Sequence, residues 1–208
     1  MRLRAPHQAA ACPSAAARGT MGCMGQLIYT GIASLDGYVA DRDGKFDWSA
    51  PDEEVHAFIN DLEREVGTYL LGRRMYEVMS VWESMGGAGD PPVIQDYARI
   101  WRAAGKVVYS RSLATADTAR TRIERTFSPN AVRELKDATA GSLGIGGATL
   151  AAAALDAGLV DECRIFLNPV AVGGGLRFLP DGLNLRLELL DQRKFGNGVV
   201  YLRYRTLS

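Results

Sequence analysis

The chain has 208 residues, of which 47% are hydrophobic and 23% charged, and its 24 basic and 24 acidic side chains leave no formal net charge. This composition predicts one globular domain with a buried core. Balanced charge gives no electrostatic footprint for nucleic acid and no polybasic patch for a membrane surface. No apolar run approaches the roughly 18 residues of a membrane span. The three cysteines and two histidines are too widely spaced for a disulfide framework or a metal site, so we expect a cytoplasmic protein without a metal.

Residues 1–24 differ from the rest of the chain, because they are rich in alanine and arginine and contain no acidic residue. They lack the apolar centre of about 7–15 residues that a secretion signal requires. We therefore expect a disordered extension, or a start assigned too early, with Met21 or Met24 as the first residue. The domain itself is expected to occupy residues 25–208.

The first predicted elements are a strand, a loop and a helix. Residues 26–33 are apolar and β-branched, which is typical of a buried strand. Asp-Gly pairs at 36–37 and 43–44 indicate turns in the segment that follows. Pro51 and three successive acidic residues mark a helix start, and apolar residues then recur at three- and four-residue spacing up to Val66. His56 on this helix is expected at the edge of the core rather than in catalysis.

Short apolar strands alternate with helices along the rest of the chain. Strands are predicted at 68–71, 106–109, 122–125, 142–145 and 161–168, and helices at 73–82, 95–101, 131–139 and 149–157. Residues 185–195 and 199–205 flank Gly196-Asn197-Gly198 and predict a closing antiparallel hairpin. The alternation predicts an α/β fold in which helices flank a mostly parallel, twisted sheet.

Three of the predicted strands run directly into turns that carry glycine or arginine, at residues 72–74, 110–111 and 146–147. In a parallel sheet these ends open on the edge where ligands bind. Glycine lets the backbone approach a ligand, helix starts attract phosphate, and arginine donates to it. Each motif alone is weak, because most Gly-Gly pairs are simple turns and most surface arginines are solvated. Together they suit a dinucleotide, and arginine near a ribose favours NADPH over NADH.

These segments resemble a known family. Ile32-Ala-Ser-Leu-Asp-Gly-Tyr-Val-Ala40, Leu71-Gly-Arg-Arg-Met-Tyr-Glu77, Val107-Val-Tyr-Ser-Arg111 and Gly146-Gly-Ala-Thr-Leu150 occur in this order. They resemble the reductase domain of the bifunctional riboflavin-biosynthesis deaminase-reductase, a domain similar to dihydrofolate reductase. The resemblance covers residues 24–207 and implies a dihydrofolate-reductase-like fold with NADPH across the strand ends. The zinc-binding motif of the deaminase half has no counterpart, so the riboflavin intermediate is not implied as substrate.

The resemblance also implies a set of cofactor-binding residues. In chain order they are Ile32 and Ala33 near the nicotinamide; Gly72, Arg73 and Arg74 at the pyrophosphate; Ser110 and Arg111 at the adenosine 2′-phosphate; and Gly146, Gly147, Ala148, Thr149 and Leu150 at the helix start over the phosphates. Dihydrofolate reductases hold the Gly-Gly pair in a cis peptide, so the resemblance implies one between Gly146 and Gly147.

Hydride transfer from NADPH requires an acceptor that an acid polarises or protonates. The stretch Trp48-Ser-Ala-Pro51-Asp-Glu53 resembles the Trp, Pro and helix-borne carboxylate of dihydrofolate reductase. On that match Glu53 is the proton-delivery candidate and Trp48 binds the substrate. The alternative is that Glu53 and its acidic neighbours only serve the helix start. Asp36 is a second candidate acid, with the alternative that its side chain only begins an Asp-Gly turn.

The function expected from these residues is NADPH-dependent reduction of a small organic substrate of pteridine or pyrimidine type. An alternative of a different class is a non-catalytic nucleotide-binding or sensing protein on the same fold. A flavin-linked reductase is a third possibility, although no flavin motif supports it. The family resemblance also implies a homodimer, formed through the edge of the C-terminal hairpin.

Overall fold

A computed structural model describes residues 25–207, and the extension predicted for residues 1–24 lies outside the described residues. The strands are β1 (Leu27–Ser34), β2 (Tyr38–Ala40), β3 (Val66–Gly72), β4 (Gly105–Tyr109), β5 (Thr121–Glu124), β6 (Ser142–Gly146), β7 (Glu162–Asn168), β8 (Leu176–Arg177), β9 (Arg186–Lys194) and β10 (Val200–Leu207). The α-helices are α1 (Glu53–Glu63), α2 (Arg73–Met79), α3 (Pro92–Ala103), α4 (Pro129–Ala138) and α5 (Ala148–Asp156), and the short 3₁₀ helices are η1 (Asp47–Ser49) and η2 (Ser80–Glu83).

The centre of the molecule is an eight-stranded sheet with the order β5-β4-β3-β6-β1-β7-β10-β9. The six strands from β5 to β7 are parallel, and β10 and β9 add an antiparallel hairpin at one edge. This arrangement confirms the predicted α/β fold with a mostly parallel sheet and a closing hairpin. The apolar, β-branched runs become central strands because a parallel sheet is covered on both faces.

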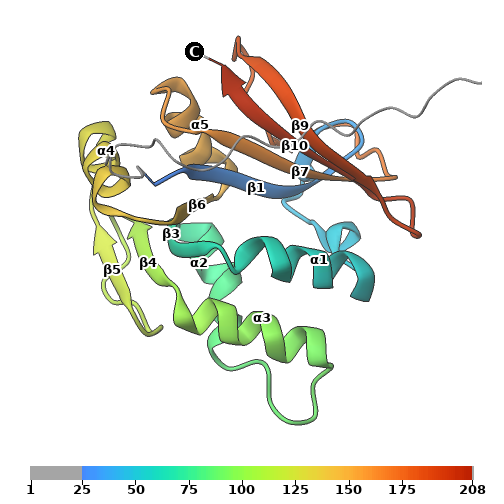
Figure 1. Ribbon diagram of the computed structural model, residues 1–208, viewed down its shortest axis with the longest axis horizontal. Helices are drawn as coiled ribbons and strands as arrows, with labels where there is room; N and C mark the ends of the chain where they lie inside the picture. Colours follow the sequence, from blue (N-terminus) through green and yellow to red (C-terminus); the bar gives the residue numbers. More distant parts are fainter. Residues whose placement is uncertain (1–24, 208) are drawn as a thin grey trace, which may run out of the picture.

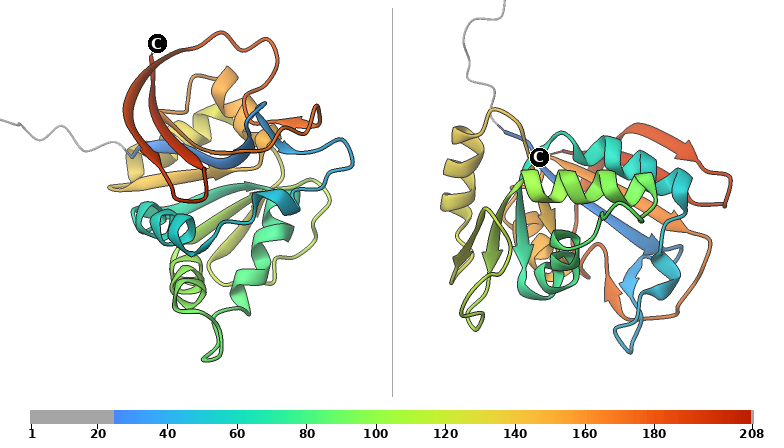
Figure 2. Two further views of the ribbon diagram at one scale, coloured as in Figure 1. Left: turned by 90° about the vertical axis from the view of Figure 1, so that its right-hand side faces the viewer. Right: turned by 90° about the horizontal axis from the view of Figure 1, so that it is seen from below.

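Helices α1, α2 and α3 cover one face of the sheet, and α4 and α5 cover the other (Figures 1 and 2). The α4–α5 face holds one hydrophobic cluster around Leu70, Leu143 and Ala151. The opposite face holds two, one around Trp101 and one around Phe166. Because the connecting helices change face after β5, the carboxyl ends of β3, β6 and β1 lie at the change of direction of the sheet, where α/β proteins commonly bind ligands.

The predicted helix starts form as expected from capping chemistry. The Asp52 side chain accepts a hydrogen bond from Val55 N at 2.9 Å and begins α1, so Pro51 precedes the cap instead of lying in the first turn. Ser128 caps α4 and Pro129 is its first residue, as predicted. The helix expected over 95–101 is longer, because Pro92 supplies a favourable first position. No helix in residues 25–207 is both long and apolar enough to cross a membrane.

The loop after β1 is fixed to the loop after β7, which the sequence did not predict. Strands β2 and β8 pair with each other in a separate two-stranded sheet. A side chain at Gly175 would collide with the carbonyl oxygen of Ala40 and with the backbone of Asp41, so only glycine lets these two segments approach so closely. The two loops are therefore held together beyond the carboxyl end of β1.

Candidate cofactor cleft and active site

The carboxyl ends of β3 and β6 lead into α2 and α5, and these two helix starts lie against each other. Gly72 is the N-cap of α2 and Gly147 the N-cap of α5, and neither helix has a side-chain cap. A Cβ on Gly147 would stand 3.7 Å from Gly72 N and 3.3 Å from the Cβ of Met75. First-turn N–H groups of two helices therefore stay open at one place, which is the arrangement that suits a pyrophosphate.

The peptide bond between Gly146 and Gly147 is trans, as are the other peptide bonds of residues 25–207, so the expected cis bond is wrong. The chain instead changes direction through Gly147 itself, which has φ of 94° and ψ of 115°. Residues with a side chain rarely adopt this backbone conformation, so glycine is required at this position. A Cβ on Gly146 would also come within 2.8 Å of the Leu71 side chain. Both glycines are thus explained by close approach between β6, β3 and α2.

The predicted helix start over the phosphates divides into buried and exposed residues. Ala148 and Leu150 are buried in the first turn of α5, and they fix the helix to the sheet. Thr149 is the exposed residue of the three, so its hydroxyl is available to a ligand. The backbone N–H groups of this turn, together with the Thr149 side chain, form the polar surface at the start of α5.

Arginines surround the neighbouring ends of β3, β4 and β5. Arg73 donates to Ser112 Oγ at 2.9 Å and pairs with Glu77 at 3.1 Å. Arg74 and Arg111 are exposed and form no ion pair or side-chain hydrogen bond with residues 25–207. Their charges are therefore available to an anion, in contrast to those of the paired arginines.

Ser110 makes structural contacts within its turn, and its predicted place at the 2′-phosphate stays a prediction. It is buried, and its Oγ accepts hydrogen bonds from the backbone N–H groups of Ser112 and Leu113. Its hydroxyl hydrogen remains available, but its observed contacts shape the turn that carries Arg111. The site thus combines a turn built by Ser110 with an exposed guanidinium on Arg111.

A hollow of about 310 Å³ lies at these strand ends, lined by Tyr109, Ser110, Arg111, Arg125, Thr126 and Phe127. Sequence reasoning missed Arg125, whose guanidinium donates to the carbonyl oxygens of Ser110 and Leu113 at 3.1 and 2.6 Å. It also missed the edge-to-face pair of Tyr109 and Phe127, whose ring centres are 5.5 Å apart. Burial, and secondarily Glu124, raises the pKa of Tyr109, so this side chain is a neutral aromatic wall. Cationic and aromatic groups here suit a phosphorylated nucleoside.

The last part of β1 has a free edge on its β6 side. β1 pairs with β7 from Ile28 to Ser34, but its pairing with β6 ends at Tyr29. Within the described residues, the backbone at Ile32 and Ala33 therefore has no strand partner on the side where Gly146 and Gly147 lie. Ala33 is fully buried and Ile32 is half-buried against the Phe166 cluster. Successive residues of a strand point their backbone groups to opposite edges, so the N–H and C=O of Ile32 face this open side and can bind a planar ligand between β1 and β6, while those of Ala33 face β7.

Three successive acids at the start of α1 have different partners. Asp52 caps the helix, and Glu54 accepts from Gly196 N at 3.1 Å and pairs with Arg193 at 3.0 Å. Glu53 forms no side-chain hydrogen bond or ion pair with residues 25–207. Helix capping and the contact with the β9–β10 hairpin thus account for its neighbours and leave the Glu53 carboxylate for chemistry. Its predicted catalytic role stays a prediction.

The Asp36 carboxylate has two backbone donors. Its oxygens accept from Val172 N at 3.1 Å and Gly173 N at 2.7 Å. A hydrogen bond with the Ser34 side chain, followed by these backbone bonds, lowers the pKa of Asp36. An ionised carboxylate that accepts two backbone hydrogen bonds joins the loops after β1 and β7. This geometry supports the turn interpretation of Asp36, and its predicted catalytic role stays a prediction.

Trp48 lies in η1, between this loop and α1. Its indole nitrogen is enclosed and has no hydrogen-bond partner among residues 25–207. Buried donors of this kind are costly unless a ligand or water satisfies them, so Trp48 retains its predicted place in the substrate site as a prediction. The described residues contain no group of three metal-ligating side chains.

Residues 26–201 match the family model of the RibD C-terminal domain. The chain is 26% identical over 181 residues to the uncharacterized protein YyaP of Bacillus subtilis, with 86% of this chain and 94% of YyaP covered.

Solved structures agree on the fold. A proposed riboflavin biosynthesis protein from Shewanella sp. PV-4 superposes with a TM-score of 0.68 at 20% identity, covering 88% of this chain and 99% of that one. Dihydrofolate reductase from Enterococcus faecalis, complexed with NADP(H) and RAB-propyl, gives 0.59 at 15%, covering 89% and 98%. The deaminase/5-amino-6-(5-phosphoribosylamino)uracil reductase of Thermotoga maritima gives 0.62 at 15%, and this chain covers only 57% of it, with 88% of its own length.

Proposed function

The chain belongs to the RibD C-terminal domain family, and we propose that it is a reductase that binds NADPH across the carboxyl ends of its parallel strands and reduces a small organic substrate of pteridine or pyrimidine type. The observation that carries this proposal is the meeting of two uncapped helix starts, at Gly72 and Gly147, beside the arginine-lined hollow. Gly147 is required by its φ of 94°, and a Cβ there would stand 3.3 Å from the Cβ of Met75 and 3.7 Å from Gly72 N, at the place proposed for the pyrophosphate.

The residues of the cleft divide the binding of NADPH among them. First-turn N–H groups after Gly72 and Gly147 receive the pyrophosphate. The Arg111 guanidinium receives the 2′-phosphate, with Arg125 holding the turn on which Arg111 lies. The free edge of β1 at Ile32 and Ala33 orients the nicotinamide ring. When bound, NADPH supplies the hydride.

The chain's own contribution to the chemistry is a proton and an oriented substrate. Glu53 delivers the proton to the substrate atom next to the carbon that accepts the hydride, and then regains a proton from water. Trp48 borders the substrate. Asp36 keeps the loop after β1 close to this region through Val172 and Gly173. The assignment of the proton donor uses the Glu53 carboxylate, which has no side-chain partner among residues 25–207.

We extend the proposal to a homodimer. Strand β9 is an edge strand of the eight-stranded sheet, with no strand partner beyond it in residues 25–207. Leu189 on this strand is 50% exposed. An open edge with an apolar side chain favours pairing with a second copy.

The experiment for the proposed function is calorimetric titration with NADPH of the wild type, Gly147→Ala and Gly158→Ala. Both glycines have positive φ, 94° and 62°, so both variants carry a backbone cost, which is about 1–2 kcal/mol for Gly158→Ala and larger for Gly147→Ala, because φ of 94° with ψ of 115° lies outside the left-handed helical region. Only the Cβ at 147 enters the cleft, since nothing lies within 4 Å of one at 158. We expect NADPH to bind the wild type and Gly158→Ala equally and Gly147→Ala about tenfold more weakly, as for one lost charged hydrogen bond. No binding by the wild type would refute the proposal.

A further inference from the structure

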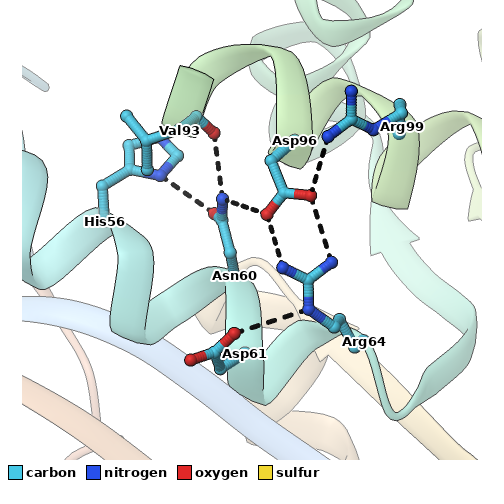
Figure 3. A network of polar contacts seen from close by, with 7 residues as sticks. All are labelled: His56, Asn60, Asp61, Arg64, Val93, Asp96 and Arg99. Carbon is cyan, nitrogen blue, oxygen red and sulfur yellow. Dashed lines mark hydrogen bonds and ion pairs between the residues drawn. The ribbon is translucent and has the colours of Figure 1, made fainter. Parts of the chain in front are cut away.

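His56 lies in the first turn of α1 at the end of a polar network that joins α1 to α3 (Figure 3). Its Nδ1 is 3.0 Å from Asn60 Oδ1. Asn60 Nδ2 donates to Val93 O at 2.9 Å and to Asp96 Oδ2 at 3.0 Å. Asp96 in turn accepts from Arg64 at 2.6 Å and from Arg99 at 3.2 Å. The network begins with exposed arginines and ends at a buried imidazole.

This network determines which histidine nitrogen carries the proton. The hydrogen bond from Arg64, the largest of several causes, lowers the pKa of Asp96, so its ionised carboxylate can only accept. A carbonyl oxygen also only accepts, and therefore the nitrogen of the Asn60 amide must face Val93 and Asp96. The Asn60 oxygen then faces His56 and requires a donor. His56 Nδ1 must carry a hydrogen, which leaves Nε2 of the neutral ring as an acceptor.

Nε2 is available to a ligand. It has no hydrogen-bond partner in residues 25–207, and it is not among the enclosed polar atoms without a partner, so it retains contact with solvent. The ring as a whole is only 8% exposed. It is held edge-on between Trp82 and Tyr97, at centre distances of 5.7 and 5.6 Å. A fixed ring with one open acceptor is a typical device for recognising a donor group.

The position of His56 connects it to the proposed active site. Helix α1 runs from η1, beside the carboxyl half of β1, to the start of β3, so its first turn lies at the ligand-binding edge of the sheet (Figure 1). His56 follows Glu53 by three residues, which places both on one side of the helix. Trp82 belongs to η2, at the far end of the helical segment that starts at Gly72. His56 therefore lies one helical turn beyond the proposed acid and packs against the end of that segment.

We propose that His56 is a substrate-binding residue whose Nε2 accepts a hydrogen bond from an N–H group of the substrate, near the atom to which Glu53 delivers its proton, with Asn60 as the positioning residue. The inference rests on the proposed function. A hydrogen-bond acceptor one helical turn from a proton donor selects a heterocycle that carries an amino or ring N–H group close to the atom that is protonated. Residues 41–54 contain six acidic and two basic side chains, so the negative charge of this segment favours a neutral or cationic substrate over a phosphorylated one.

The tautomer is tested without any ligand. Long-range ¹⁵N–¹H spectra of the wild type at pH 8 distinguish a proton on Nδ1 from one on Nε2, and His56→Gln identifies the signals against those of His7. We expect the Nδ1–H form, and a mixture of tautomers in Asn60→Ala. An Nε2–H form in the wild type would overturn the proposal, because Nε2 could not then accept.

Binding is tested with 2,4-diaminopyrimidine added to the NADPH complex, with unsubstituted pyrimidine as the matched probe. We expect His56→Leu to bind the diamine about tenfold more weakly than the wild type, and His56→Gln to recover most of the loss because its amide oxygen replaces Nε2. Thermal unfolding of each variant shows that it is folded. Equal binding by wild type and His56→Leu, or no binding by the wild type complex, would overturn the proposal. Failure of NADPH itself to bind would refute the proposed function, while the tautomer spectra would still stand.

Discussion

Replacement of Arg111 by alanine separates the 2′-phosphate contact from the rest of the cofactor cleft. Arg111 is exposed at the edge of the 310 Å³ hollow and forms no ion pair or side-chain hydrogen bond with residues 25–207, so its loss costs the fold little. A hydrogen bond to a charged group is worth about 1.5–3 kcal/mol, and the exposure of this site favours the lower value. We therefore expect NADPH binding to weaken about 10–30-fold.

The assay is parallel fluorescence titration with NADPH and NADH at fixed salt, following the protein's tryptophans. NADH lacks the 2′-phosphate, so its affinity for Arg111→Ala is expected to stay within about twofold of the wild-type value, well below one lost hydrogen bond. Arg122→Ala is the matched control: it removes the same charge from β5, where Arg122 is exposed and pairs with Glu124 at 3.2 Å. A loss that is equal for NADPH and NADH, or equal for the two variants, would refute the assignment of Arg111.

Two further predictions concern the proton and the stability of the fold. With a substrate that the wild type reduces, Glu53→Gln is expected to slow the reaction about 10²–10⁴-fold and to leave NADPH affinity unchanged. Glu54→Gln, which changes the adjacent acid, is expected to keep most of the rate. Similar rates for both variants would contradict the role of Glu53. Glu162→Gln removes the buried partner of Arg203, bonded through both oxygens at 2.7 Å, and of Arg164 at 3.4 Å. Because Arg203 is partly exposed, we expect a loss of about 2–3 kcal/mol at pH 7, or about 5–10 °C in Tm by calorimetry. Burial opposes ionisation of Glu162, but the bonds from Arg203 and Arg164 outweigh burial and lower the pKa of Glu162 below the usual 4.5. The stability advantage of the wild type over Glu162→Gln should therefore be complete above pH 4.5 and disappear as the pH falls through the lowered pKa. A stability difference that does not depend on pH would contradict this.

The fold was predictable because local signals and global topology agree. Apolar runs of strand length end at Gly72 and Gly146, and Asp52 and Ser128 cap the helices that follow the loops. The small sheet of β2 and β8 was not predictable in this way. Its strands have three and two residues, and their pairing depends on the close approach of Gly175 to Ala40, a contact between residues far apart in sequence.

The candidate site was predictable where its residues lie in short local motifs, and was not where it depends on contacts between distant residues. Motifs that combine a strand end with a helix start, such as Gly72-Arg73 and Gly147-Ala148, lie at the ligand-binding edge as expected. Arg125 was missed because its target, the carbonyl oxygen of Ser110, is 15 residues earlier in the chain. An arginine as the last residue of the predicted strand 122–125, at the ligand-binding edge, was the available signal. The free acceptor of His56 depends on Asp96 of another helix, and no sequence pattern on α1 could reveal it.

Hydrogen–deuterium exchange of the wild type with and without saturating NADPH tests most directly whether the cofactor lies across the strand ends. We predict protection in the segments 72–76, 109–113, 125–127 and 146–151, which come together only in the folded sheet. We expect no change in the outer strand β9, at the opposite edge of the sheet from β5. Protection confined to other segments, or none at all, would contradict a nicotinamide cofactor cleft at this edge.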